Sequence, residues 1–268
     1  MIGRAELAFE KQRGRTVLVR SRVNAPMAVV RPFDLPGGGL LVQLLSLGPG
    51  LCGGDRIHID VAAGAGTRVA ITTTAATRVM SMDDSAAAEQ HVTLRAGEAS
   101  VLEYYPSLTI PFPNAALAQT ISAAAAADAR IGVVECWAMG RAARAEYLQF
   151  RVLDSRTTIA IDGRTVYVDA MRLDSRDRAL PGAGVLAGRR YIAAGVWCGV
   201  TLPVADSEEA PLASRDPLVA FGPSREGLAY LRALGADGPA VDAAVRASVE
   251  RVARAWGLPP VALERFHN

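Results

Sequence analysis

Short segments rich in β-branched residues recur along this chain, with a turn signal about every ten residues. Clear examples are TVLVRSRV (16–23), GLLVQLLSL (39–47), RIHIDVAA (56–63) and TRVAITTT (67–74), and the pattern continues to about residue 202. Many short strands at this spacing predict a mostly β fold: a sandwich, a barrel, or a solenoid resembling a β-helix. No exact internal repeat singles out the solenoid.

The hydrophobic period changes from two to 3.6 near the C-terminus. Between Pro239 and Trp256 the apolar residues fall on one helical face, which predicts an amphipathic helix ending at Gly257. A shorter helix is expected over 224–234. We therefore predict one domain spanning all 268 residues, and we divide it into three parts: a β body over about 16–202, a loop over 203–223, and a helical hairpin over about 224–256.

Composition excludes several classes of protein. Half of the residues are hydrophobic and the net charge is only +2, which excludes a disordered chain and disfavours a dedicated nucleic-acid binder. The longest uncharged stretch, 35–54, holds seven glycines and two prolines, so it is not a membrane helix. Three cysteines without C-x-x-C spacing, and no secretory signal, favour a reducing, cytoplasmic location.

The familiar cofactor motifs are absent or misplaced. Gly48, Gly50 and Gly53 match G-x-G-x-x-G, but a strand pattern follows them where a dinucleotide site requires a helix, so we interpret them as a hairpin loop. The three histidines have no metal-ligand spacing. His58 is expected on a solvated strand face, with a single loose metal contact as the alternative.

Three carboxylates share strand parity with apolar residues and so are expected on core-facing positions: Asp55, Glu135 and Glu146. A buried carboxylate is unfavourable unless it is paired or reaches water. One interpretation is an internal arginine partner, with Arg130, Arg141 and Arg144 close in sequence. The other is a set of carboxylates that line an internal polar passage.

Four ordered blocks resemble the urease accessory protein UreD family, also called UreH. They are LCGGDRIHIDV, GAGTRVAITTTAATRVM, VLEYYPSLTIPFPNA and ECWAMGRAARAE, and the C-terminal GPSREGLAYLRALG and GLPPVALERF also fit. The chain departs from the family pattern at Thr74, where glutamine is usual, at Arg78, where lysine is usual, and at Ala145, where glycine is usual. The resemblance covers nearly the whole chain.

The resemblance implies a mostly β fold of solenoid character with two C-terminal helices. It also implies a scaffold and metal conduit, not an enzyme, that acts in nickel insertion into apo-urease with UreF and, through UreF, the GTPase UreG. Such a protein would belong to a hetero-oligomer, dimeric forms included, without a tightly bound cofactor. It would hold Ni²⁺ transiently, through oxygen ligands or one imidazole.

Within this interpretation Asp55, which matches the family's G-G-D, is the leading conduit residue, with Glu135 and Glu146 as further candidates. UreF is expected to dock near 224–256 or on adjoining strands, with Tyr230 and Arg232 as contact residues. The equally weighted alternative for the apolar stripe from Val241 to Trp256 is that it packs only on the β body. Two other functions remain open. One is a hydrolase or isomerase that uses two carboxylates such as Asp55 and Glu135. The other is an interaction module without a metal role.

Overall fold

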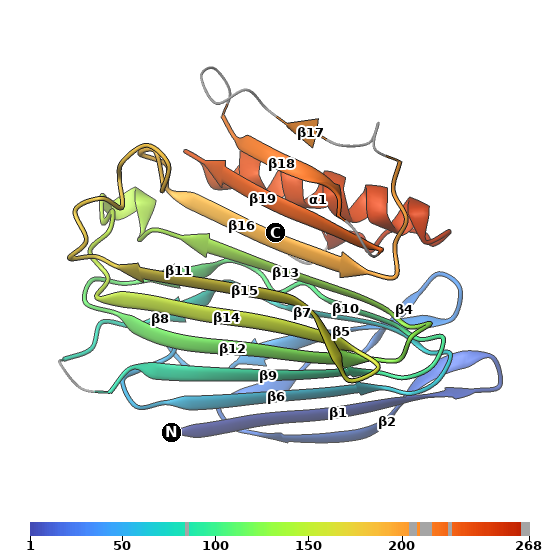
Figure 1. Ribbon diagram of the computed structural model, residues 1–268. Helices are drawn as coiled ribbons and strands as arrows, with labels where there is room; N and C mark the ends of the chain where they lie inside the picture. The colour runs from blue at the N-terminus through green and yellow to red at the C-terminus, as the bar shows by residue number, and fades with distance from the viewer. Residues whose placement is uncertain (84–85, 204–207, 210–215, 225–226, 264–268) are drawn as a thin grey trace.

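Two β-sheets stacked face to face form the body of the protein (Figure 1). The computed structural model describes residues 1–83, 86–203, 208–209, 216–224 and 227–263. The first sheet has seven strands in the order β15 (Arg164–Asp174), β14 (Val152–Ile161), β12 (Ala116–Ala125), β9 (Ala88–Ala96), β6 (Arg56–Ala63), β1 (Ile2–Gln12) and β2 (Arg15–Asn24).

The second sheet has twelve strands. Its main path runs β17 (Glu208–Glu209), β18 (Leu218–Pro223), β19 (Leu228–Gly235), β16 (Tyr191–Cys198), β13 (Arg130–Ala138), β10 (Val101–Tyr104), β7 (Arg68–Thr73), β5 (Gly39–Ser46) and β3 (Met27–Val29). The short strands β4 (Phe33–Leu35), β8 (Thr77–Val79) and β11 (Thr109–Pro111) branch from it, and the 3-10 turn η1 (Ala142–Arg144) joins β13 to β14.

The chain winds between the sheets like a solenoid. In the seven-stranded sheet, β1, β6, β9, β12 and β14 pair in parallel, and in the other sheet β5, β7, β10 and β13 do the same. Apart from the short strands β8 and β11, the strands from β6 to β14 alternate between the two sheets along the chain. The mostly β, solenoid-like fold expected from the sequence is therefore confirmed.

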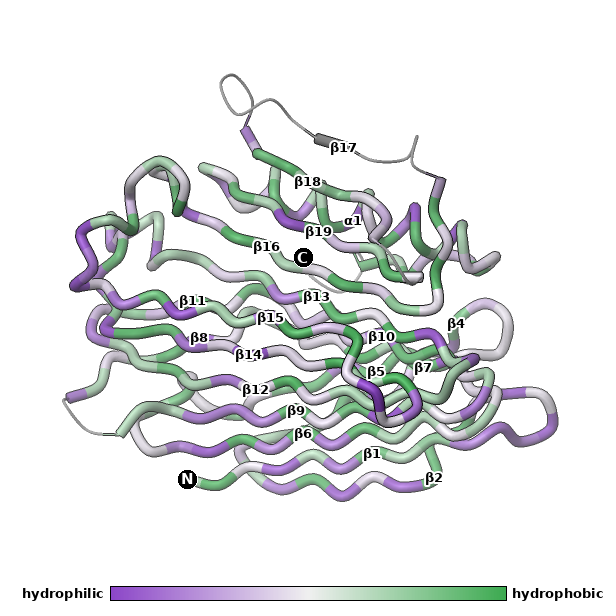
Figure 2. Tube along the Cα trace, viewed as in Figure 1, coloured by the Kyte–Doolittle hydropathy of each residue, from purple (hydrophilic) through white to green (hydrophobic). Residues whose placement is uncertain are grey.

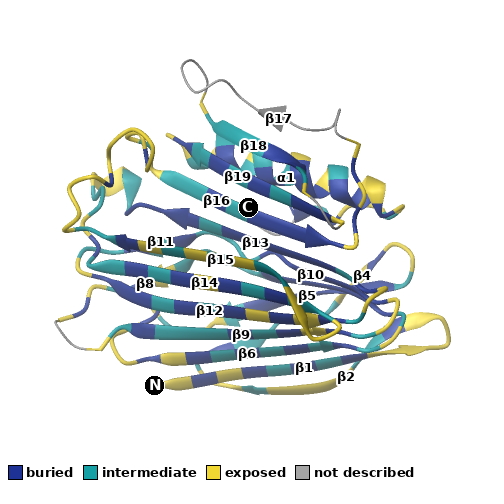
Figure 3. Cartoon of the chain, viewed as in Figure 1, coloured by how far each residue is buried: buried dark blue, intermediate teal, exposed yellow. Residues whose placement is uncertain are grey.

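Alternation along each strand creates the core between the sheets. In β6, Ile57, Ile59 and Val61 are buried, while the residues between them face outward and are at least partly exposed. Figure 2 shows the resulting alternation of hydrophobic and hydrophilic positions, and Figure 3 shows buried and less buried positions alternating in the same strands. The inner faces therefore define the space in which any internal site must lie.

The helix α1 (Gly238–Ala255) covers the outer face of the twelve-stranded sheet against β16 and β19 (Figure 1). Asp237 caps it by accepting a 2.9 Å hydrogen bond from the Ala240 N–H, and proline stands in its first turn. Its apolar stripe comprises Val241, Val245, Val249, Val252 and Trp256, and it is buried in one cluster with β16, β18 and β19. Of the two alternatives for this stripe, the structure shows the packing on the β body. No helix among the described residues has the length and apolar character needed to cross a lipid bilayer.

Two arginines, the buried Arg68 and the partly buried Arg130, fasten the segment after α1 to the β body. Arg68 donates a 2.6 Å hydrogen bond to the carbonyl of Pro259, and Arg130 donates one of 2.6 Å to the carbonyl of Trp256. Arg68 also lies 3.6 Å from the carboxylate of Glu103, which is only 1% exposed. The C-terminal segment thus packs over an ion pair on the outer face of the sheet.

Two predicted boundaries were wrong. The shorter helix expected over 224–234 is instead β19, whose residues alternate between the α1 side and the opposite side, while 225–226 lie outside the described residues. Among the described C-terminal residues there is therefore one α-helix, not a helical hairpin. The β body begins at Ile2 rather than residue 16, because β1 buries Ala5, Leu7 and Phe9 on one face.

The expected loop over 203–223 also contains structure. Its last residues form β18, and Glu208–Glu209 form β17 beside it. Residues 204–207 and 210–215 lie outside the described part of the chain.

Candidate functional site

Glu135 is the carboxylate that the fold places deepest between the two sheets. It lies on β13, is 7% exposed, and shares its face with the buried residues Val133 and Trp137. Three neutral groups from the opposite sheet donate hydrogen bonds to it: Gln119 Nε2 at 2.7 Å, Ser155 Oγ at 2.7 Å and Thr157 Oγ1 at 2.6 Å. Glu135 is thus solvated by protein dipoles, and none of these three donors carries a charge.

The donors to Glu135 belong to a line of polar side chains that crosses the inner face of the seven-stranded sheet. Gln90 on β9 donates a 2.9 Å hydrogen bond to Gln119 on β12, and Gln119 pairs in register with Ser155 on β14. Each of these residues has the parity of buried apolar neighbours in its own strand. We call these residues, together with Glu135 and Thr157, the polar track.

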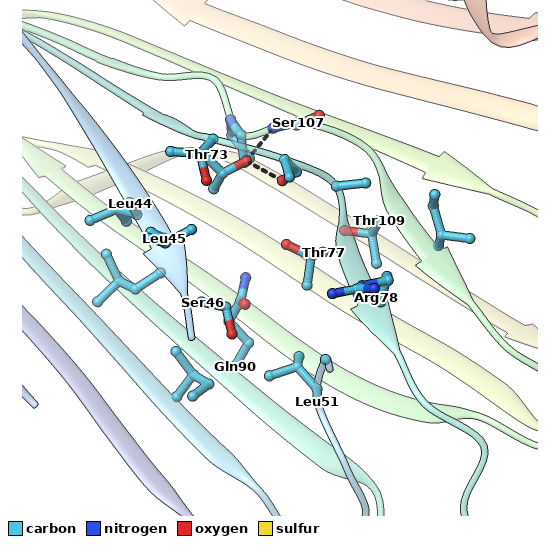
Figure 4. Close-up of a pocket in the computed structure, with 18 of the residues that line it drawn as sticks. Leu44, Leu45, Ser46, Leu51, Thr73, Thr77, Arg78, Gln90, Ser107 and Thr109 are labelled. Carbon is cyan, nitrogen blue, oxygen red and sulfur yellow. Dashed lines mark hydrogen bonds between the residues drawn. The ribbon is translucent and has the colours of Figure 1, made fainter. Parts of the chain in front are cut away.

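A cavity of about 440 Å³ opens at one end of the polar track, where Gln90, Gln119 and Glu135 line it. We call it cavity 1. Its lining also includes hydroxyl groups and a cation, and Figure 4 shows Thr77, Thr109 and Arg78 close to one another. Thr73 accepts a 3.0 Å hydrogen bond from the Ser107 N–H there, which ties β7 to the segment before β11.

A second cavity, of about 510 Å³, lies at the other end of the polar track, and we call it cavity 2. Ser155 and Thr157 line it from β14, and Ala194 and Arg232 line it from β16 and β19. Glu135 and Trp137 line both cavities. Glu135 therefore borders both cavities.

The surroundings of Glu135 favour its neutral form over its charged form. Burial raises the pKa of Glu135 above its ordinary value, and the nearby charge of Asp169 adds to the increase. The hydrogen bonds from Thr157, Ser155 and Gln119 oppose this shift. A cation beside Glu135 would favour the carboxylate and lower its pKa, so the site is electrostatically suited to receive positive charge.

Asp169 and Arg232 face each other in cavity 2. Arg232 Nη2 lies 2.8 Å from Asp169 Oδ2, and the same nitrogen donates a 3.1 Å hydrogen bond to the Tyr167 hydroxyl. Asp169 and Tyr167 lie on β15, the edge strand of the seven-stranded sheet. This ion pair joins the edge of one sheet to β19 of the other.

Asp55, the leading candidate from the sequence, lies away from the polar track. Its Oδ1 accepts a 2.6 Å hydrogen bond from the Met1 ammonium group, and its Oδ2 accepts one of 2.9 Å from the Cys52 N–H. It is not among the residues that line cavity 1 or cavity 2. Neither of these two cavities brings Asp55 and Glu135 together, as two-carboxylate catalysis would require.

Glu146 follows η1 and pairs with an arginine from the same loop. Arg141 Nε donates a 2.6 Å hydrogen bond to Glu146 Oε2, and this contact lowers the pKa of Glu146. Of the two interpretations left open by the sequence, the arginine partner applies to Glu146. Glu146, too, is absent from the lining of both cavities.

The two residues expected to contact a partner lie on β19 rather than on a helix. Tyr230 and Arg232 point to the side opposite α1, and Arg232 borders cavity 2. His58 stacks on His91 of the neighbouring strand with ring centroids 5.2 Å apart, on the outer face of the seven-stranded sheet. The described residues contain no group of three or more His, Cys, Asp or Glu side chains that could hold a metal ion.

Sequence reasoning missed most of the polar track. Gln119 has the parity of Leu117 and Ile121, and Ser155 and Thr157 have the parity of Leu153 and Ile159. Applying the parity test to uncharged polar residues would have placed them inside. The contact between Asp169 and Arg232 had no such signal, because it depends on how two distant strands pack.

The comparisons with known proteins agree on one family. The family model for the UreD urease accessory protein matches residues 1–267. The chain belongs to the UreD family. As a member it is a urease accessory protein and not itself an enzyme.

Relatives of this family resemble the chain over three quarters of its length or more. The urease accessory protein UreD of Deinococcus radiodurans is 38% identical over 267 residues, which cover 98% of this chain and 94% of that protein. UreD 1 of a Synechococcus species is 34% identical, covering 100% of this chain and 97% of that protein. UreD of Herpetosiphon aurantiacus is 33% identical over 75% of this chain and 70% of that protein.

Proposed function

We propose that this UreD protein acts in nickel insertion into apo-urease, and that Ni²⁺ passes between its two sheets along the polar track. The observation that carries the proposal is the position of Glu135, which lines both internal cavities and is held by three neutral donors. Family membership supplies the connection to urease. Ni²⁺ is cargo here, not a resident cofactor.

The chemistry of the polar track suits a cation in transit. Carboxylate, amide and hydroxyl oxygens are hard ligands that bind Ni²⁺ less tenaciously than imidazole or thiolate ligands do. The polar track presents one carboxylate and several such oxygens. Burial raises the pKa of the Cys136 and Cys198 thiols to about 12, so these thiols remain protonated and offer no thiolate. Such a path lets an ion enter and leave again.

We further propose that UreF docks on the side of β18 and β19, near Tyr230, and that UreG joins through UreF. The seven-stranded sheet ends on that side at its edge strand β15, and the strands β19 and β18 of the twelve-stranded sheet extend beyond it (Figure 1). A partner on this side would lie next to cavity 2, where it could receive or supply the ion. Asp55 and Glu146 remain candidates for contacts with the ion outside the two cavities. We place this work in the cytoplasm, which suits three free cysteines.

The test is urease maturation with and without this chain. Apo-urease is co-expressed with its other accessory proteins in a host that lacks urease, and the nickel content and activity of the purified urease are measured. We expect both to fall severalfold when this chain is omitted and limiting nickel is supplied. Equal nickel content without the chain would contradict the proposal, and turnover of a small molecule by the isolated chain would favour an enzyme instead.

A further inference from the structure

Glu135 and Arg232 occupy one row across the inner face of the twelve-stranded sheet. Glu135 on β13 pairs in register with Ala194 on β16, and Ala194 pairs with Arg232 on β19. Strands lie about 4.8 Å apart, so the backbones of Glu135 and Arg232 are separated by about 10 Å. Only the methyl group of Ala194 projects between them on this face.

A matching row on the seven-stranded sheet closes a ring around this gap. Thr157 on β14 pairs in register with Asp169 on β15. Thr157 donates to Glu135 at 2.6 Å, and Asp169 lies 2.8 Å from Arg232. The two carboxylates therefore approach cavity 2 from opposite sheets, and both line it.

The negative charges of the two carboxylates are stabilised in different ways. Glu135 has three neutral donors and is deeply buried, whereas Asp169 is paired with a guanidinium whose side chain is 42% exposed. A half-exposed ion pair contributes at most about 1 kcal/mol, because water screens it. Of the charged residues in the ring, Arg232 is thus the one whose displacement costs the least free energy.

We propose that Arg232 is a displaceable counter-ion, which pairs with the Asp169 carboxylate until a divalent cation reaches that carboxylate. The inference rests on the proposed transit of Ni²⁺ past Glu135 and names the next step. The ion moves from Glu135 toward Asp169, Arg232 swings away, and its return to Asp169 helps to release the ion. Arg232 acts through Asp169 and is therefore a positioning residue.

The alternative is that the ion pair only fastens β15 to β19. Both roles require the contact, but they differ in their effect on metal affinity. A fastening role gives no reason for Ni²⁺ to bind more tightly when Arg232 is removed. A competing counter-ion does, because its removal leaves the Asp169 carboxylate free for the cation.

The experiment is isothermal titration calorimetry, in which Ni²⁺ is titrated into the purified protein at constant pH and ionic strength. We expect Arg232→Gln to bind Ni²⁺ up to about fivefold more tightly than the unsubstituted protein, the change in affinity that corresponds to about 1 kcal/mol. Arg232→Lys, which keeps a positive charge beside Asp169, should return affinity toward the original value. Adding Asp169→Asn to Arg232→Gln should abolish the gain.

The matched control is Arg246→Gln, which removes the same charge from a half-exposed pair with Asp242 on α1. Circular dichroism and thermal melting verify the fold of each variant. An affinity of Arg232→Gln equal to or below the original, or no measurable binding by any variant, would overturn the inference. If Glu135→Gln still lowers urease nickel in that case, the proposed function stands without the counter-ion.

Discussion

The hydroxyl of Thr157 donates a 2.6 Å hydrogen bond to Oε2 of Glu135, although the two residues lie in opposite sheets. This contact, with those from Ser155 and Gln119, allows a carboxylate to be buried in the space between the sheets. Removing one donor should therefore affect both stability and the electrostatics of the site.

Thr157→Val keeps the shape of the side chain and removes the hydrogen bond to Glu135. We expect it to lower the free energy of unfolding by about 1.5–3 kcal/mol, because the lost bond is made to an ionisable group. Urea denaturation measures the change. Thr158→Val is the matched control, since Thr158 is the next residue of β14 and faces outward; a loss there as large as at Thr157 would contradict this assignment.

Stability should depend on pH through Glu135. Its pKa in the folded state is raised above the ordinary value of 4.5, so the folded state binds the proton more strongly than the unfolded state does. Stability is therefore complete below the unfolded pKa and declines as pH rises through the folded pKa. Glu135→Gln cannot ionise, so its stability relative to the unsubstituted protein should increase with pH above about 4.5.

Urea unfolding of both proteins at a series of pH values tests this. Comparing the two proteins cancels the contribution of Glu103, whose pKa burial also raises. A stability difference that is constant with pH, or that shrinks as pH rises, would show that Glu135 is not the group responsible.

Ala194→Leu should obstruct cavity 2 without changing any charge. The methyl group of Ala194 lies between Glu135 and Arg232 in the register, and a larger side chain would fill the gap. We expect urease nickel content to fall severalfold at limiting nickel, with a stability change of at most about 1–3 kcal/mol from overpacking. Ala62→Leu, on the outer face of β6, is the control and should leave nickel content unchanged. If Ala194→Leu and Ala62→Leu gave urease of equal nickel content, that result would argue against passage of Ni²⁺ beside Ala194.

Glu103→Ala should destabilise the protein strongly while leaving both cavities intact. It removes the carboxylate 3.6 Å from Arg68, whose guanidinium also holds the segment after α1. A buried charge left without its partner costs about 3–5 kcal/mol, and urea denaturation measures this loss. A change below about 1 kcal/mol would indicate that solvent or Pro259 alone compensates Arg68.

The sequence predicted those features that depend on local periodicity. The parity of Glu135 placed it on the inner face, and the spacing from Val241 to Trp256 predicted the helix α1 and its apolar face. The strand β19 was mistaken for a helix because Leu228, Leu231 and Leu234 recur every three residues, as on a helical face. Both faces of this strand are at least half-buried, so polar residues do not mark a period of two.

Features that depend on packing between distant segments could not be predicted. Asp55 has the parity of a core position, yet the Met1 ammonium group reaches it across the start of β6. Asp169 and Arg232 lie 63 positions apart, and only the stacking of β15 on β19 brings them together. The order of the strands and the way the two sheets stack decide such contacts, and a local pattern of residues encodes neither.

Nickel delivery by Glu135→Gln tests the central claim most directly. Urease is matured with the original protein or with Glu135→Gln at limiting nickel, and the same samples are analysed for nickel per urease and for co-purification of the accessory complex. We expect the complex to form equally with both proteins, because Glu135 is buried, and the nickel content to fall severalfold with Glu135→Gln. Equal nickel content with an intact complex would contradict a path along Glu135.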